Sequence, residues 1–176
     1  MKLKAGDKIE KLDLPSINGK NFNIKDISGE KTLITFYRFA TCPFCNLRIN
    51  EIIKRYDELD KNFKMIAIFD SPLEYLTETM KKHNAPFTIL ADEEFKYFKQ
   101  YDIEQSLWKF LIGSTVGFFK IFRAFANGYF PLQLRSMTTV PVDILINKNG
   151  TIEKVFYGRH TIDHLTFEEI KEFSSK

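Results

Sequence analysis

The chain is poor in the residues that build metal centres and disulfide frameworks, with only two cysteines and three histidines among 176 residues. Two cysteines close at most one disulfide, so a cystine-rich scaffold is excluded. A zinc site needs about four ligands. Cys42, Cys45 and some of His83, His160 and His164 could supply them only if distant segments converge, so we expect no metal and no cofactor.

Long apolar stretches are also missing. No uninterrupted run reaches the length of a transmembrane helix, and the segment MKLKAGDKIEKLDL has no apolar core of the kind found in signal peptides. We therefore expect a cytoplasmic protein, where two cysteines are more often reactive thiols than a permanent bridge. The length and the 44% apolar composition favour one folded domain over residues 1–176.

Acidic residues are absent from residues 105–142, a segment that holds the four cations Lys109, Lys120, Arg123 and Arg135. These cations more than account for the formal net charge of +3. Because four cations in so apolar a segment do not form a basic surface suited to a nucleic-acid backbone, we expect no nucleic-acid partner.

The two cysteines lie together between an apolar run and a helical pattern. Residues 32–37 are mostly β-branched or aromatic, as in a strand buried on both faces, and apolar residues recur at helical spacing from Leu47 to Leu59. Cys42-Pro-Phe-Cys45 at the start of that helix puts the sulfurs one turn apart, and the helix N-terminus stabilises a thiolate there. This favours a redox dithiol, while a zinc site, a structural disulfide and two unrelated core cysteines remain alternatives.

The segment FYRFATCPFC resembles the active-site segment of the thioredoxin-fold superfamily, and more narrowly the peroxiredoxin-like branch of the AhpC/TSA (redoxin) family. The resemblance continues in GDKIEKLDLPSINGKNFNI and VPVDILINKNGTIEKVFYGRH. It implies an α/β thioredoxin-like fold, with a central mixed β-sheet flanked by helices, an N-terminal hairpin and a helical insertion. It also implies thiol-dependent reduction of peroxides or disulfides, with a thioredoxin-like protein or a small thiol as reductant.

The resemblance allows two registers for the attacking cysteine. The peroxiredoxin pattern places Cys45 at the peroxidatic position and Cys42 at a threonine position. The thioredoxin pattern makes Cys42 the attacking thiol and Cys45 the resolving one, with Thr41 in place of a tryptophan. The sequence leaves both registers open.

Two further positions follow from the resemblance. The place of the peroxiredoxin arginine on a late strand holds Pro141, which in thioredoxins is a cis-proline facing the cysteines, so a cis Val140–Pro141 peptide is expected. Arg38, four residues before Cys42, is a candidate to replace the missing arginine, although a solvated loop arginine is an equal alternative.

Strands alternating with helices predict βαβ units with a largely parallel centre. The expected strands are residues 32–37, 63–69, 86–90, 142–146 and 151–157. Asn18-Gly19 predicts a hairpin turn near the N-terminus. Beyond the helix that follows Cys42, helices are expected from Ser71 as N-cap to about His83, from Asp92 to about Tyr101, and from Thr166, where Glu169 completes a capping box.

The segment 105–139 is expected to form a helical insertion, broken or bent at Gly113 and Gly117. Its wide apolar face leaves three interpretations open. The first is a helical pair that covers the active site and buries its own phenylalanines. The second is a homodimer interface through residues 105–130, and the third is contact with a membrane surface. A non-catalytic sensing or binding module that uses this surface is the alternative to an enzyme.

Overall fold

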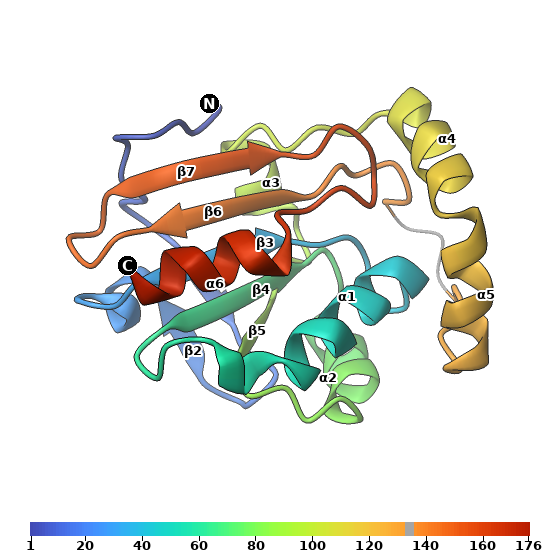
Figure 1. The fold of residues 1–176 in the computed structure, drawn as a ribbon, viewed down its shortest axis with the longest axis horizontal. Coiled ribbons are helices and arrows are strands. Elements are labelled where there is room, and N and C mark those ends of the chain that lie inside the picture. The colour runs from blue at the N-terminus through green and yellow to red at the C-terminus, as the bar shows by residue number, and fades with distance from the viewer. Residues whose placement is uncertain (133–135) are drawn as a thin grey trace.

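The computed structural model describes residues 1–132 and 136–176 and is organised around a mixed five-stranded sheet, in the order β5-β4-β3-β6-β7 (Figure 1). The strands are β3 (Thr32–Phe36), β4 (Lys64–Phe69), β5 (Thr88–Ala91), β6 (Val142–Ile146) and β7 (Ile152–Tyr157). The central strand β3 pairs in parallel with β4 and antiparallel with β6. All five of its residues are buried, which confirms the predicted two-faced strand and the mixed α/β class.

Helices cover both faces of this sheet. The helices are α1 (Pro43–Lys54), α2 (Leu73–Lys81), α3 (Lys96–Gln100), α4 (Leu107–Val116), α5 (Phe118–Ala126) and α6 (Phe167–Ser175). Apolar residues of α1, α2 and α6 form one core with one face of the sheet, whereas α3 and the N-terminal segment form the second core on the opposite face. None of the helices in the described residues is long and apolar enough to span a bilayer.

The predicted N-terminal hairpin is confirmed. Strands β1 (Asp13–Pro15) and β2 (Asn21–Asn23) pair antiparallel, and Gly19 adopts a φ of +82° in the turn between them, a conformation that glycine tolerates without strain. Strands β6 and β7 also pair antiparallel around Gly150.

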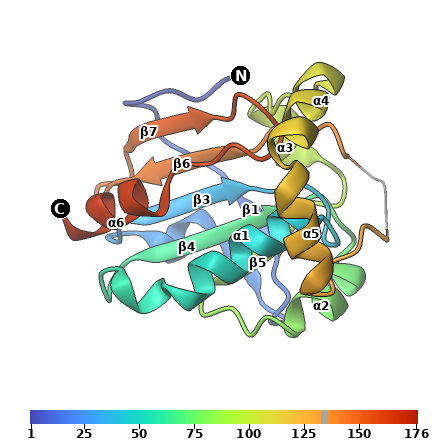
Figure 2. The same ribbon diagram turned by 45° about the vertical axis from the view of Figure 1, so that its right-hand side comes forward.

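Helices α4 and α5 lie at one edge of the molecule, outside the sheet, and α5 packs beside α1 (Figures 1 and 2). The predicted break occurs at Gly117, while Gly113 stays inside α4. A Cβ atom on Gly113 would lie 2.3 Å from Thr161 Oγ1, and one on Gly117 would lie 2.8 Å from Phe44 Cε1. The helix pair therefore packs on the domain through its small residues.

The large apolar side chains of this segment point outward, so the expectation that the pair buries its own phenylalanines is wrong. Trp108 is 75% exposed and Phe119 is 83% exposed. Residues 133–135, which include Arg135 of the acid-free segment, lie outside the described residues.

The prediction of a cis Val140–Pro141 peptide is wrong, because this bond is trans and no cis peptide occurs among the described residues. The trans form is the lower-energy isomer of an X–Pro bond by about 0.5–1 kcal/mol. Here it also lets the chain run extended into β6. The Val140 N–H donates to the Glu104 carbonyl, and the Pro141 carbonyl accepts from the Gly158 N–H.

Two helix starts behave differently from each other. The helix predicted from Asp92 starts only at Lys96, with Phe95 at the cap position. Asp92 nevertheless satisfies the first amides of this helix, because it accepts hydrogen bonds from the N–H groups of Lys96, Tyr97 and Phe98. Ser71 was expected to cap α2, but Pro72 occupies the cap position without a side-chain bond. The Ser71 hydroxyl instead accepts from the Ala40 N–H at 2.9 Å, because the loop before Cys42 passes beside it.

Candidate redox site

The cysteines occupy the first turn of α1, as the strand, loop and helix pattern predicts. Pro43 starts the helix, where its missing N–H costs nothing. Cys42 is the N-cap, and its Sγ accepts a hydrogen bond from the Cys45 backbone N–H at 3.2 Å. Both thiols are free and buried, with exposed fractions of 0% for Cys42 and 4% for Cys45.

The two thiols are electrostatically unequal. Burial raises the pKa of Cys42, but the hydrogen bond from the Cys45 thiol, the charge of Arg38 and two backbone amides outweigh it, and the pKa falls to about 7. Burial raises the pKa of Cys45, and the hydrogen bond to Cys42 and its negative charge raise it further. The geometry therefore favours a thiolate on Cys42 beside a protonated Cys45.

Arg38 is a buried cation next to both sulfurs and not a solvated loop residue. Its side chain is folded inward, and Nη1 donates to the Met137 carbonyl at 3.1 Å. Burial lowers its pKa, but the neighbouring Cys42 and Cys45 reverse that effect and raise it. The guanidinium interacts with both sulfurs through its charge and through side-chain hydrogen bonds.

The other candidate residues lie in or beside the cysteine loop. Thr41 is buried immediately before Cys42. Val142 pairs with Phe36, so the preceding residues Val140 and Pro141 lie beside the point where β3 runs into the cysteine loop. Both are buried, and their backbone groups bond elsewhere, as described above.

Sequence reasoning missed a polar network under the cysteine loop. The buried Asn46 donates from Nδ2 to the carbonyls of Ala40, at 2.7 Å, and Cys42, at 2.9 Å. Its Oδ1 lies 2.7 Å from His83 Nε2, so the partly buried His83 belongs to this network. Burial, with Lys82 nearby, lowers the pKa of His83 to about 4. An asparagine four residues after Cys42 was the available signal, but its partner comes from the turn that follows α2.

A second pair lies at the other side of the cysteines. The buried Asp143 accepts from the Leu165 N–H at 2.7 Å and from His164 Nδ1 at 3.2 Å. Burial opposes ionisation of Asp143, but His164 and the other donors hold its pKa below the usual value. In the described part of the chain, no three histidine, cysteine or acidic side chains converge as metal ligands would.

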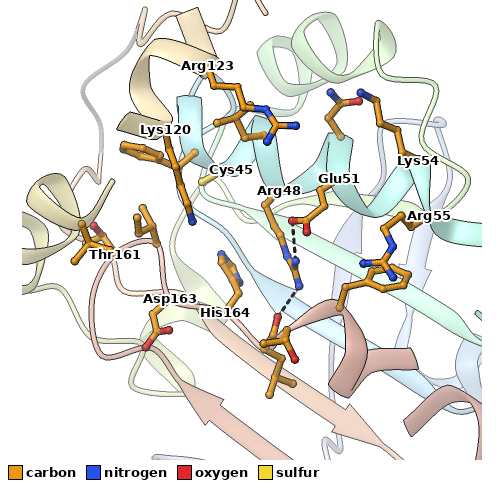
Figure 3. Close-up of a pocket in the computed structure, with 18 of the residues that line it drawn as sticks. Cys45, Arg48, Glu51, Lys54, Arg55, Lys120, Arg123, Thr161, Asp163 and His164 are labelled. Atoms are coloured by element: carbon orange, nitrogen blue, oxygen red, sulfur yellow. Dashed lines mark hydrogen bonds and ion pairs between the residues drawn. The ribbon is translucent and has the colours of Figure 1, made fainter. Parts of the chain in front are cut away.

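A cleft of about 710 Å³ opens between α1, α5 and residues 160–168. Cys45, rather than Cys42, lines it, and Arg48 and Glu51 of α1 lie beside it (Figure 3). Lys120 and Arg123 enter from α5, and Thr161 and His164 from the opposite wall. One of the two sulfurs therefore faces a space large enough for a small molecule.

Comparison with known proteins shows the family of the chain. The AhpC/TSA family model matches residues 5–155. Peroxiredoxin Bcp of Escherichia coli is 31% identical over 102 residues, which cover 57% of this chain and 65% of the relative, just under two thirds. Peroxiredoxin Bcp of Bacillus subtilis is 23% identical over 181 residues and the full length of both chains.

The structural comparison supports the fold. Peroxidoxin BcpB from Mycobacterium tuberculosis superposes with a TM-score of 0.66 and 13% identity, covering 92% of this chain and 90% of the other. The family match spans most of the chain, including both cysteines and the whole central sheet except the end of β7. The chain therefore belongs to the AhpC/TSA family of thioredoxin-like α/β proteins.

Proposed function

We propose that the protein is a thiol peroxidase in which Cys42 attacks the peroxide and Cys45 resolves the product. The observation that carries this assignment is the place of Cys42 at the N-cap of α1, where its Sγ accepts a hydrogen bond from the Cys45 N–H. This bond and the charge of the buried Arg38 depress the pKa of Cys42. A thiolate is the nucleophilic form of cysteine, and about half of Cys42 is ionised at neutral pH when its pKa is near 7.

The chemistry has two steps. The Cys42 thiolate attacks one peroxide oxygen, so the S–O bond forms as the O–O bond breaks, and the departing alkoxide or hydroxide takes a proton. Cys45 then loses its proton and attacks the Cys42 sulfenic acid, which forms the disulfide and releases water. Two equivalents of an external thiol restore the dithiol. The names of the peroxiredoxin relatives support peroxide as the oxidant, while a disulfide substrate is the second candidate.

The assignment is tested by trapping sulfenic acid after a stoichiometric pulse of hydrogen peroxide. We expect rapid trapping on Cys42 in the Cys45→Ser variant and slow trapping on Cys45 in the Cys42→Ser variant. The reverse result would assign the attack to Cys45. Peroxide turnover that survives both substitutions would instead mean that the dithiol is not catalytic, as in a sensing module.

Thr41, Val140 and Pro141 are proposed to shape the cavity around the cysteines through packing. We further propose that residues 1–176 act as one domain, with residues 105–139 as an insertion, in the cytoplasm. The reducing cytoplasm would keep Cys42 and Cys45 as the free thiols that the cycle starts from.

We propose a second copy of the chain as the partner of the exposed α4–α5 face. Trp108, Phe119 and Phe122 are exposed there, which is unusual for a face that stays in water. The nearby cations are engaged elsewhere: Lys109 pairs with Glu104, and Lys120 and Arg123 line the cleft. An uncharged aromatic face suits a symmetric protein interface better than an anionic membrane surface, which needs flanking cations.

The dimer is tested by the triple substitution of Phe118, Phe119 and Phe122 with serine. We expect the particle mass from light scattering to fall from that of two chains to that of one, with unchanged secondary structure. A single-chain mass in the unsubstituted protein at micromolar concentration would exclude the dimer, and binding of that protein to anionic vesicles would point to the membrane surface instead.

A further inference from the structure

The charges of the Cys45 cleft do not cancel. Five lysines and arginines and three carboxylates line it. Each carboxylate is already ion-paired with an arginine, as Glu51–Arg48, Asp163–Arg159 and Glu168–Arg55. The remaining cations are Lys54, Lys120 and Arg123, and none of them forms an ion pair with a described residue. The cleft therefore presents unneutralised positive charge next to a sulfur.

Two of these cations stand opposite the dithiol helix. Lys120 and Arg123 project from α5 into the cleft that Cys45 lines from α1 (Figure 3). Lys120 lies near enough to His160 to contribute to the lowering of its pKa, after the larger effect of burial. Lys120 and Arg123 belong to the acid-free segment, so no carboxylate of α5 itself competes for them.

We propose that this cleft binds the carboxylate groups of a low-molecular-weight thiol, which reduces the Cys42–Cys45 disulfide by attacking Cys45. The inference rests on the proposed dithiol cycle and adds the chemical class of the reductant. The cleft, at about 710 Å³, is in the usual range for small-molecule sites. Cys45 lies at its wall beneath α5 with little exposed surface, which suits a small thiol better than the broad surface of a protein reductant.

The reduction balances with two thiols. The first reductant thiolate attacks Cys45 Sγ, forming a mixed disulfide as the Cys42–Cys45 bond breaks, and Cys42 leaves as a thiolate. A second reductant thiolate attacks the reductant sulfur of the mixed disulfide, releasing the reductant disulfide and the Cys45 thiolate, which takes up a proton. Attack on Cys45 is also the faster direction, because a sulfur of lower pKa is the better leaving group, and that sulfur is Cys42.

The test measures reduction of the oxidised protein by mercaptosuccinate, which carries two carboxylates, and by neutral 2-mercaptoethanol. The disulfide is formed beforehand with diamide, so the measurement does not depend on peroxide turnover. The rate ratio of the two thiols is compared between the unsubstituted protein and Lys120→Gln/Arg123→Gln. Lys99→Gln/Lys148→Gln is the matched control, because it removes two exposed positive charges outside the cleft.

We expect the ratio of mercaptosuccinate to 2-mercaptoethanol rates to fall about five- to tenfold in the cleft variant, and less at high salt, since exposed charges are screened. The control and the charge-conserving Lys120→Arg/Arg123→Lys variant should keep the ratio within about twofold. An unchanged ratio in the cleft variant overturns the proposal but leaves the peroxidase assignment intact, as does a disulfide that neither thiol reduces. Failure of the peroxidase assignment shows separately, as loss of sulfenic acid trapping on Cys42.

Discussion

Arg38 offers the sharpest test of how the site activates its thiol. Replacing Arg38 with methionine removes the buried positive charge that faces both sulfurs and keeps a long, unbranched side chain in its place. The hydrogen bond from Arg38 Nη1 to the Met137 carbonyl is also lost. The helix N-terminus and the Cys45 N–H remain, so the variant isolates the contribution of the charge.

The expected size of the effect follows from the pKa of Cys42. With a pKa of about 7, half of the thiol is ionised at pH 7. An opposite charge within a few ångströms typically changes a pKa by about one to three, so the variant pKa should lie between about 8 and 10. The thiolate fraction at pH 7 then falls to between about 10% and 0.1%, and the rate of reaction with hydrogen peroxide falls by roughly 5- to 500-fold.

The pKa is measured by following the ultraviolet absorbance of the thiolate as a function of pH, and the rate by stopped-flow mixing with peroxide. Arg38→Lys should restore much of both values, because it keeps the charge. Arg48→Met is the matched control, since Arg48 also donates to a backbone carbonyl, that of Leu165, but lines the cleft. A Cys42 pKa that stays near 7 in Arg38→Met would refute the role assigned to this arginine.

Three further predictions concern packing, pH and local stability. Gly113→Ala should loosen α4 and lower the free energy of unfolding by about 1–3 kcal/mol, because its Cβ would meet Thr161 Oγ1 at 2.3 Å. The midpoint of thermal unfolding should fall accordingly, whereas Thr115→Ala on the exposed side of α4 should leave it unchanged. His83 has a folded-state pKa of about 4, so the unfolded chain binds more protons between about pH 6.5 and 4 and stability falls as the pH falls through that window. Denaturant titrations of His83→Gln should lack about 1 kcal/mol of that pH dependence, a value reduced for its partial exposure, and equal slopes in both proteins would contradict it. Thr166→Ala should cost about 1 kcal/mol in the same assay through loss of the α6 cap, and a cost near zero would mean that the cap is dispensable.

The elements that could be predicted from the sequence are those set by local physics. The capping box of Thr166 and Glu169 forms as expected, because both residues satisfy backbone groups within one turn. Ser71 fails as a cap for the opposite reason. Its hydroxyl is equally suited to the Ala40 N–H, which reaches it only after β3 and β4 have paired, and spacing along the chain carries no information about that encounter.

The candidate site divides in the same way. Cys42 and Cys45 are found from the sequence because their chemistry depends on a single helical turn. The partner of Asn46 could not be found, since His83 comes from the turn after α2 and meets it only through tertiary packing. The cis peptide at Pro141 was inferred from resemblance alone, and here the preceding Val140 N–H bonds to Glu104 in a trans, extended backbone.

The α4–α5 segment contributes to the site through its smallest residues, which sequence analysis undervalued. Gly117 lets α5 approach Phe44, one of the two residues between the cysteines, and the buried Ala124 continues that contact surface along α5. This close approach has two consequences on the same helix. It places Lys120 and Arg123 in the wall of the Cys45 cleft, and it leaves the phenylalanines facing solvent. A helix packed through its aromatic face would reverse both, so the small residues account for the charged cleft and the exposed aromatic surface together.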